Sequence, residues 1–493
     1  MERAVSKLDI PVNPQRKEEI MEQKLVLQRQ QNSKLPLKVK LAYGLSGYSS
    51  FITWTIFSLY GLYFFTDVVG MSAAFAGAII SLGTIWDAIT DPIIGSVSDN
   101  LKCKKGRRRP LIIGVAVPFV LISILLFTNF GFSETISKLY FVIVILLYYT
   151  AQTVLDIASS ALGSEMTLDY DERSSLATYK NFFCMVVVII VSPTLMLATY
   201  FGKFFENSSF GWSCTLAVYM VIALACILIL WKATKGYERY SEDSNNKIGF
   251  KDIKELLKNK SVRIVMAIFA LAVFGNTINL SLQVYYYSYY VQMTEAQIAS
   301  VTMVVGIISC IAAFGVDFLC KKFSKKAAWI IAVGVEALSM IVFIGLIIHP
   351  GQVGLIYVLV ILMALGLASV YQVPWSMIPD CVDVHQLVTQ KRTDGIIFGF
   401  IAFLQKVAGA VAIAAVGSTL TAIGYVAAAE QTAETLQSMK YVYGFGCGGI
   451  FLITVLIILL YPLSKKRHDD VLEAIDAREQ GEAVDMSQFK DLF

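Results

Sequence analysis

Twelve apolar stretches, each long enough to cross a bilayer, are the feature that most restricts how this chain can fold. A helix needs about 20 mainly apolar residues to span the hydrocarbon layer. The predicted spans are 40–66, 73–98, 109–130, 137–163, 176–201, 211–232, 263–290, 297–320, 327–348, 353–378, 394–424 and 440–463. The content of charged residues is 16%, below the ~25% usual for soluble domains. We therefore predict an all-α membrane protein.

Lysine and arginine alternate from one predicted loop to the next. The basic segments are the N-terminal tail, 102–109, 232–263, 321–326 and 465–467, and the loops between them hold almost no Lys or Arg. Because cytoplasmic loops carry an excess of these residues, both termini are expected in the cytoplasm, with the protein in the plasma membrane.

A long polar interruption divides the twelve spans six and six, which predicts a layout of two six-helix bundles. A weak internal repeat, an acid followed by a basic turn, occurs at 95–105 and 315–322. It fits a parallel duplication, although short cytoplasmic loops are often basic in any case. The predicted regions are a cytoplasmic tail 1–37, a six-helix bundle 38–232, a cytoplasmic linker 233–262, a second six-helix bundle 263–464 and a cytoplasmic tail 465–493.

Four ionisable residues lie deep within the predicted spans. Asp87 and Asp91 are four residues apart on span two, so they share one helix face. Asp156 on span four and Lys406 on span eleven lie 9 to 12 residues from a span end, or roughly 14 to 18 Å at ~1.5 Å per residue. Acids and bases from both bundles are therefore expected to meet near the membrane midplane.

Charge balance at this level favours a monovalent cation. Three acids against one base leave two negative charges uncompensated, and each buried charge costs roughly 2.5–3.5 kcal/mol at the membrane centre. Asp87 and Asp91, with the hydroxyls of Thr90 and Thr153, form an oxygen-rich set that suits sodium. Proton coupling through the same carboxylates stays open, as does a static cluster that only holds helices together.

The run Ile85-Trp86-Asp87-Ala88-Ile89-Thr90-Asp91-Pro92-Ile93-Ile94-Gly95 resembles the helix-two signature of the glycoside-pentoside-hexuronide:cation symporters, the melibiose-permease group of the major facilitator superfamily. The resemblance extends over about residues 38–465. It is carried further by Tyr43-Gly44, 65–70, the basic loop 104–110, 153–157, 169–173, 379–383 and 405–409.

The resemblance implies a role for each deep residue. It assigns cation binding to Asp87, Asp91 and Thr153, with Thr90 in a place where the family often has Asn. It also implies that Asp156 accepts sugar hydroxyls and that Lys406 links the cation and sugar sites.

Departures from the family pattern leave the substrate open. The helix-one Lys-Asp pair of the melibiose permease falls near Ser50 and Phe51, and the helix-four Trp falls at Ser160. Near the family's helix-five Arg this chain has Lys180 and Asn181, which we include among the candidate substrate-binding residues.

Further residues are candidates for substrate contact or gating. Trp54, Tyr48, Gln152 and Trp375 could line a polar path, since sugar sites combine polar groups with aromatic faces. Each could equally make an interhelical hydrogen bond. The predicted gating residues are Asp380, Asp383 and Arg173.

These observations predict a cation-coupled (sodium or proton) symporter that carries a sugar into the cell by alternating access. The three histidines do not lie in the bilayer middle and no HExxH motif occurs, so an enzyme is not expected. The expected partners are a sugar, a monovalent cation and membrane lipid, with no cofactor, no nucleic acid and a monomer as the working unit. The alternative is a carrier of an amphipathic, lysolipid-like substrate, since such carriers resemble the same family.

Overall fold

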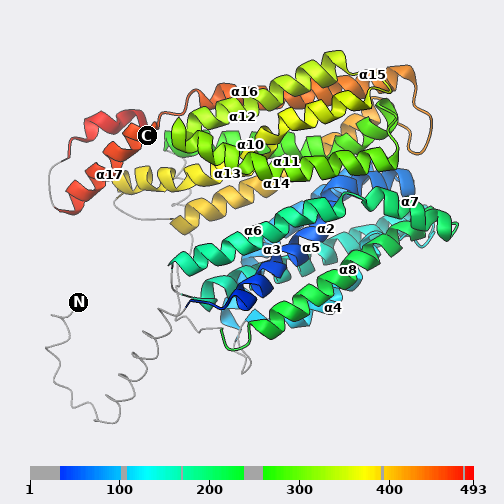
Figure 1. Cartoon of the computed structure of the whole chain (residues 1–493), viewed down its shortest axis with the longest axis horizontal. Coiled ribbons are helices and arrows are strands. Elements are labelled where there is room, and N and C mark those ends of the chain that lie inside the picture. The colour runs from blue at the N-terminus through cyan, green and yellow to red at the C-terminus, as the bar shows by residue number, and fades with distance from the viewer. Residues whose placement is uncertain are drawn as a thin grey trace, which may run out of the picture.

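The computed structural model describes residues 34–101, 108–167, 170–237, 259–389, 394–480 and 484–492. Most of the predicted N-terminal tail, the basic loop at 102–107 and the central part of the linker lie outside the described residues. Within those ranges, all regular secondary structure is helical (Figure 1).

Helices fill both halves of the chain. The first half contains α2 (Leu37–Tyr63), its π-helical continuation η2 (Phe64–Val68), α3 (Ala73–Asn100), α4 (Arg108–Leu126), α5 (Glu134–Met166), α6 (Tyr170–Val191), α7 (Thr194–Phe204) and α8 (Ser208–Ala233). The second half contains α10 (Lys260–Tyr285), η3 (Tyr286–Tyr290), α11 (Glu295–Lys322), α12 (Lys325–Ser339), η4 (Met340–Ile347), α13 (Val353–Thr389), α14 (Asp394–Ala422), α15 (Ala433–Tyr441), η5 (Val442–Cys447) and α16 (Gly448–Ile458). The tail forms α17 (Lys465–Glu479) and η6 (Met486–Leu492).

Eleven of the described helices are long and apolar enough to span a membrane, and a bent pair gives a twelfth span. That pair, Ser175–Val191 and Thr194–Phe204, bends by 45°. Pro193 lies at the bend, where its missing N–H removes a helical hydrogen bond. The predicted spans coincide with these helices, whose ends often extend several residues further because a helix continues into the polar region.

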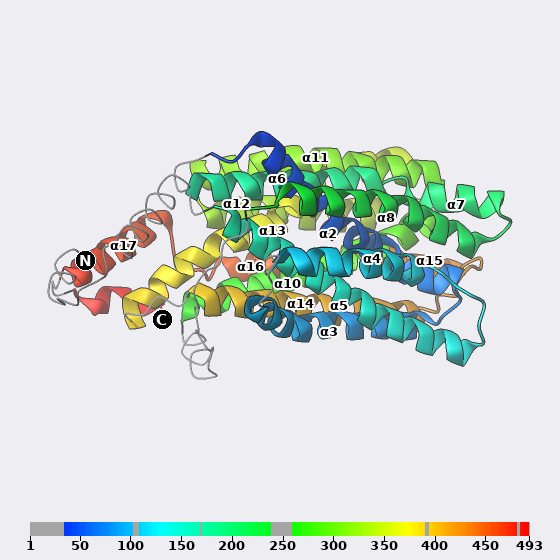
Figure 2. The same cartoon turned by 90° about the horizontal axis from the view of Figure 1, so that it is seen from below.

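The two halves pack side by side (Figures 1 and 2). Helix α3 packs along α14, α2 contacts α10, and α6 contacts α11. We call the end where α2 begins and α17 lies the terminus side, and the opposite end, where α2 continues into η2, the far side.

On the far side, α3 and α14 approach each other backbone to backbone. A Cβ atom on Gly417 would lie 2.3 Å from the carbonyl oxygen of Ala73, and one on Gly77 would lie 2.8 Å from that of Ile413. The amide of Ala74 also donates to Thr421 Oγ1 over 3.1 Å. Small residues therefore set the contact that orients α3 against α14.

The C-terminal helix α17 docks on the terminus side of the second half. His468 Nε2 lies 3.0 Å from Asp383 Oδ2 at the end of α13, and Arg478 donates to the carbonyl of Leu387. Val471 is fully buried beneath the helix. The tail is thus a folded part of the second half.

Candidate cation and substrate site

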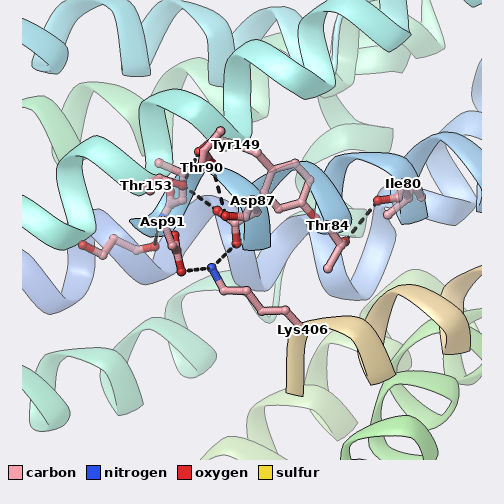
Figure 3. Close-up of polar contacts among 10 residues, drawn as sticks. Ile80, Thr84, Asp87, Thr90, Asp91, Tyr149, Thr153 and Lys406 are labelled. Atoms are coloured by element: carbon pink, nitrogen blue, oxygen red, sulfur yellow. Dashed lines mark hydrogen bonds and ion pairs between the residues drawn. The ribbon is translucent and has the colours of Figure 1, made fainter. Parts of the chain in front are cut away.

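A lysine from one half lies between two carboxylates of the other half. Lys406 Nζ, on α14, is 2.6 Å from Asp87 Oδ2 and 2.5 Å from Asp91 Oδ2, both on α3 (Figure 3). The side chains of Asp87 and Lys406 are 15% and 26% exposed, whereas Asp91 is 37% exposed. The two carboxylates therefore face the other half of the molecule.

Local sequence explains why α3 presents this acidic face. Asp87 and Asp91 are one turn apart, while Ile89, Ile93 and Val97 form an exposed apolar stripe on the same helix. Pro92 lies inside α3 and has no N–H, so the carbonyl of Ala88 loses its usual helical donor. A further backbone oxygen is thereby made available beside the acidic pair.

Hydroxyl groups complete the oxygen-rich surroundings. Thr153 Oγ1, on α5, donates to Asp87 Oδ1 over 2.5 Å and also lies 2.9 Å from the carbonyl of Tyr149. Thr90 Oγ1 is buried and donates to the carbonyl of Asp87 over 3.1 Å. Carboxylate, hydroxyl and carbonyl oxygens are the ligands that hard cations prefer. The four predicted cation-binding residues therefore lie together.

A second charged cluster lies one turn further along α5. Lys180 Nζ, on α6, is 3.2 Å from Asp156 Oδ1 and 2.8 Å from Ser160 Oγ. Half of the Asp156 side chain is exposed (52%), so it can contact a solute. Thr153 and Asp156 are three residues apart, which makes α5 the element that both clusters share.

The pairing of Lys180 with Asp156 changes the predicted charge balance. From the sequence, the deep residues were expected to carry two uncompensated negative charges, because only Lys406 was counted as a base. Three carboxylates against two ammonium groups leave one. A single monovalent cation would neutralise this remaining negative charge.

Of the other predicted substrate residues, two are tryptophans and two carry amide side chains. Trp54 stacks on Phe51 at 4.9 Å on a partly exposed face of α2, and Trp375 packs edge-on against Phe269 in the second half. Gln152 bonds to the carbonyl of Ser50 over 2.7 Å, and Asn181 is exposed on α6.

Tyr48 is not brought to this cluster. It is 3% exposed, and its hydroxyl lies 3.5 Å from the carbonyl of Tyr219. The reason is that residue 48 falls on the face of α2 that packs against α8. Its position corrects the expectation that it lines the polar path.

The predicted gating residues make contacts within their own halves. Asp380 pairs with Lys325 at 2.7 Å, and Asp383 pairs with His468. Arg173 donates to the carbonyls of Thr167 and Ser164. These contacts do not join the two halves, so any gating by these residues must occur in another state.

Sequence reasoning missed a polar contact on the far side. Asp67, in η2, accepts hydrogen bonds from Tyr289 and Tyr425 of the second half. An acid at the end of an apolar span was the available signal, because such an acid needs a donor when it is partly buried.

Two helical bundles that meet around charged residues at mid-depth define a transporter of the major facilitator superfamily. A solved D-xylose-proton symporter has a similar fold, with a TM-score of 0.60 at 15% identity over 87% of this chain and 98% of that one. The family described as MFS/sugar transport protein matches residues 42–465, so the chain belongs to that family. The predicted resemblance to the glycoside-pentoside-hexuronide symporters is confirmed.

Curated relatives cover nearly the whole chain. An uncharacterized symporter of Bacillus subtilis, YnaJ, is 27% identical over 93% of this chain and 98% of its own. A putative glycoside/cation symporter of Escherichia coli, YagG, is 27% identical over 92% and 98%. The chain is thus a multi-pass secondary transporter, and the prediction that it is not an enzyme is confirmed.

Proposed function

We propose that this protein couples the entry of one sodium ion or proton to the entry of a sugar, by alternating access. The observation that carries the proposal is Lys406, which holds Asp87 and Asp91 from across the interface and leaves one negative charge uncompensated. A static cluster has no need for that residual charge, whereas a travelling cation neutralises it.

The cation and substrate sites communicate through α5. Thr153 contacts Asp87 and Asp156 pairs with Lys180, so a change at the acidic pair reaches the second cluster within one helical turn. A bound cation lowers the cost of holding the two halves together at Asp87 and Asp91. By linkage, the cation raises sugar affinity and sugar raises cation affinity by the same factor.

A hydroxyl-rich substrate fits the second cluster. The Asp156 carboxylate accepts hydrogen bonds from hydroxyl groups, Lys180 donates them, and Trp54 offers an aromatic face for C–H surface. The glycoside/cation symporter named among the relatives supports a sugar over a lysolipid-like substrate. We assign a glycoside, pentoside or hexuronide as the substrate class.

The remaining assignments follow from charge and architecture. The basic loops favour a cytoplasmic terminus side, and we propose that the protein lies in the plasma membrane. One chain supplies both halves of the site, which supports a monomer as the working unit.

A vesicle screen tests this function. Membrane vesicles with an imposed sodium or proton gradient would be offered labelled glycosides, pentosides and hexuronates. We expect at least one sugar to accumulate above its external concentration, and accumulation to end when the gradient is collapsed. Uptake of a sugar that only equilibrates, whichever gradient is imposed, would contradict coupling.

A further inference from the structure

The Asp67 carboxylate is bound by donors from the opposite half of the molecule. Tyr425 Oη lies 2.6 Å from Oδ1 and 2.7 Å from Oδ2, and the amide of Ala428 donates to Oδ1 over 3.2 Å. Tyr289, in η3, also donates to Oδ1. Asp67 belongs to the first half, whereas all three of these donors belong to the second.

Neighbouring residues pack around the hydrogen bonds of Asp67. Thr66 is fully buried, donates to Asp67 Oδ2 over 2.6 Å and lies 2.7 Å from the hydroxyl of Tyr285. The ring of Tyr285 packs edge-on against Tyr425, with centroids 5.2 Å apart. On its other side Tyr285 packs against Tyr63 of α2. We call Asp67 and its hydrogen-bond donors the Asp67 hub. The hub joins the two halves and packs beside the ring of Tyr285.

The far side differs from the terminus side in this respect. Three ion pairs on the terminus side each lie within one half, namely Lys40 with Glu172, Arg108 with Glu165 and Lys325 with Asp380. On the far side, the Asp67 contacts join the halves beside the close approach of Gly77 and Gly417. The structure thus shows the state in which the far side is shut.

We propose that Asp67 is the latch of the far-side gate. Alternating access, on which this inference rests, requires the halves to separate on the far side, and the Asp67 hydrogen bonds then pass to water. Hydrogen bonds to a charged acceptor are among the strongest in proteins. The latch therefore sets the balance between the two access states, while the substrate and the coupling ion act at the midplane.

The chemistry of the hub requires a carboxylate. Both oxygens of Asp67 accept, and each of the four groups that contact them donates, namely the hydroxyls of Thr66, Tyr289 and Tyr425 and the amide of Ala428. An Asn in this place would turn an NH₂ group toward donors, which removes acceptors and adds an unsatisfied donor. Tyr289→Phe and Tyr425→Phe each remove one donor and leave the aromatic packing in place, so they weaken the latch in smaller steps.

Thiol accessibility from the two membrane faces tests the latch. Ser58→Cys provides a reporter on α2, where Ser58 is partly exposed one turn beyond Trp54 toward the far side. A membrane-impermeant thiol reagent would be added to right-side-out and inside-out vesicles. Labelling of the peptide that carries the Ser58→Cys substitution would be followed by mass spectrometry, so the native cysteines can stay. A protease site added at the C-terminus assigns the face that each vesicle exposes.

We expect Asp67→Asn to speed labelling from the far side by about tenfold or more and to slow labelling from the terminus side. Tyr425→Phe and Tyr289→Phe should give smaller shifts in the same direction. Asp317→Asn is the matched control, because this exposed acid pairs only one turn away, with Lys321, and it should change neither rate.

Unchanged far-side labelling in both Asp67→Asn and Tyr425→Phe would overturn the latch. A similar increase from both faces would also overturn it, because that pattern reports loosened packing rather than a shift between access states. No substrate or ion gradient enters the readout. A failed uptake screen with an intact latch therefore refutes the proposed symport alone.

Discussion

Lys406 has an unusual position, because its ammonium group joins two carboxylates of the other half at distances of 2.5–2.6 Å. A buried ion pair adds little net stability when it is intact, yet removing one partner is costly because a charge is left uncompensated. A residue with this energy balance is better suited to a contact that breaks and re-forms during transport than to one that only stabilises the fold. Predictions at the residue scale follow from that asymmetry.

Asp87→Asn and Asp91→Asn should each abolish gradient-driven accumulation. Each change removes a carboxylate ligand and the residual negative charge that the cation neutralises. We expect accumulation to fall at least about tenfold, measured as labelled sugar in vesicles, while Asp317→Asn transports normally. Wild-type coupling in either variant would remove the acidic pair from the mechanism.

Asp156→Ala should abolish substrate binding in a folded protein. The carboxylate that accepts hydroxyl groups is lost, and Lys180 is left without its 3.2 Å partner. We expect the sugar-induced rise in melting temperature to disappear, while the variant still unfolds in a single cooperative transition. Ser160→Ala, which removes only a neighbouring hydroxyl, is the milder control. Unchanged sugar affinity would refute the role.

The sequence identified part of this site because charges inside apolar spans are rare and expensive. Asp87, Asp91 and Lys406 were found in this way. The partnership of Lys180 with Asp156 and that of Asp67 with Tyr425 were not predicted. Both depend on how helices rotate against each other, and Asp67 and Tyr425 are far apart in the chain.

At the scale of helices, the close packing of α14 against α3 requires a glycine, which has no side chain, at position 417. Gly417→Val should weaken the far-side contact, since a Cβ would lie 2.3 Å from the carbonyl of Ala73. Overpacking of this kind costs about 1–3 kcal/mol, so we expect a lower melting temperature and faster far-side labelling of the Ser58→Cys reporter. Gly399→Ala, on the same helix with open space around it, should change neither.

The docking of α17 should depend on pH through His468. Its hydrogen bond with Asp383 and the nearby Asp380 raise the pKa of His468 above its usual value, although burial opposes them. A raised pKa means that the stabilisation is complete below about 6.5 and is lost as pH rises through the folded-state value. The protection factors of residues 465–479, which correct hydrogen exchange for the pH dependence of its intrinsic rate, should therefore be larger at pH 5.5 than at pH 8.

Replacing His468 provides the control for the docking experiment. His468→Ala should show low protection factors for residues 465–479 at both pH values, because no titrating partner then faces Asp383. Equal protection of α17 in the unmodified protein across this pH range would show that Arg478 and the buried Val471 hold the helix without the histidine.

Hydropathy predicted helices well and their irregularities poorly. A window average detects apolar length, so spans such as 73–98 were located within a few residues. The bend before Thr194 and the extension of α13 to Thr389 were missed. Proline bends the chain at Pro193 but is accommodated at Pro374 and Pro379 inside α13, a difference that depends on the surrounding helices.

For the whole molecule, the structure describes two halves joined at the midplane by ion pairs and on the far side by the Asp67 hub. The six-and-six division was visible in the sequence. The access state was not, because it depends on contacts between the halves, such as that of Asp67 with Tyr425, that hydropathy does not detect.

The number of charges carried with each sugar tests the central claim most directly. Proteoliposomes on a solid-supported membrane would be given a pulse of an uncharged glycoside or pentoside, because the charge of a hexuronide would cancel that of the ion, and labelled uptake would be measured in parallel. The single uncompensated charge of the site predicts one positive charge moved inward per sugar and no current in Asp91→Asn. Sugar entry without current in the unmodified protein would contradict the account.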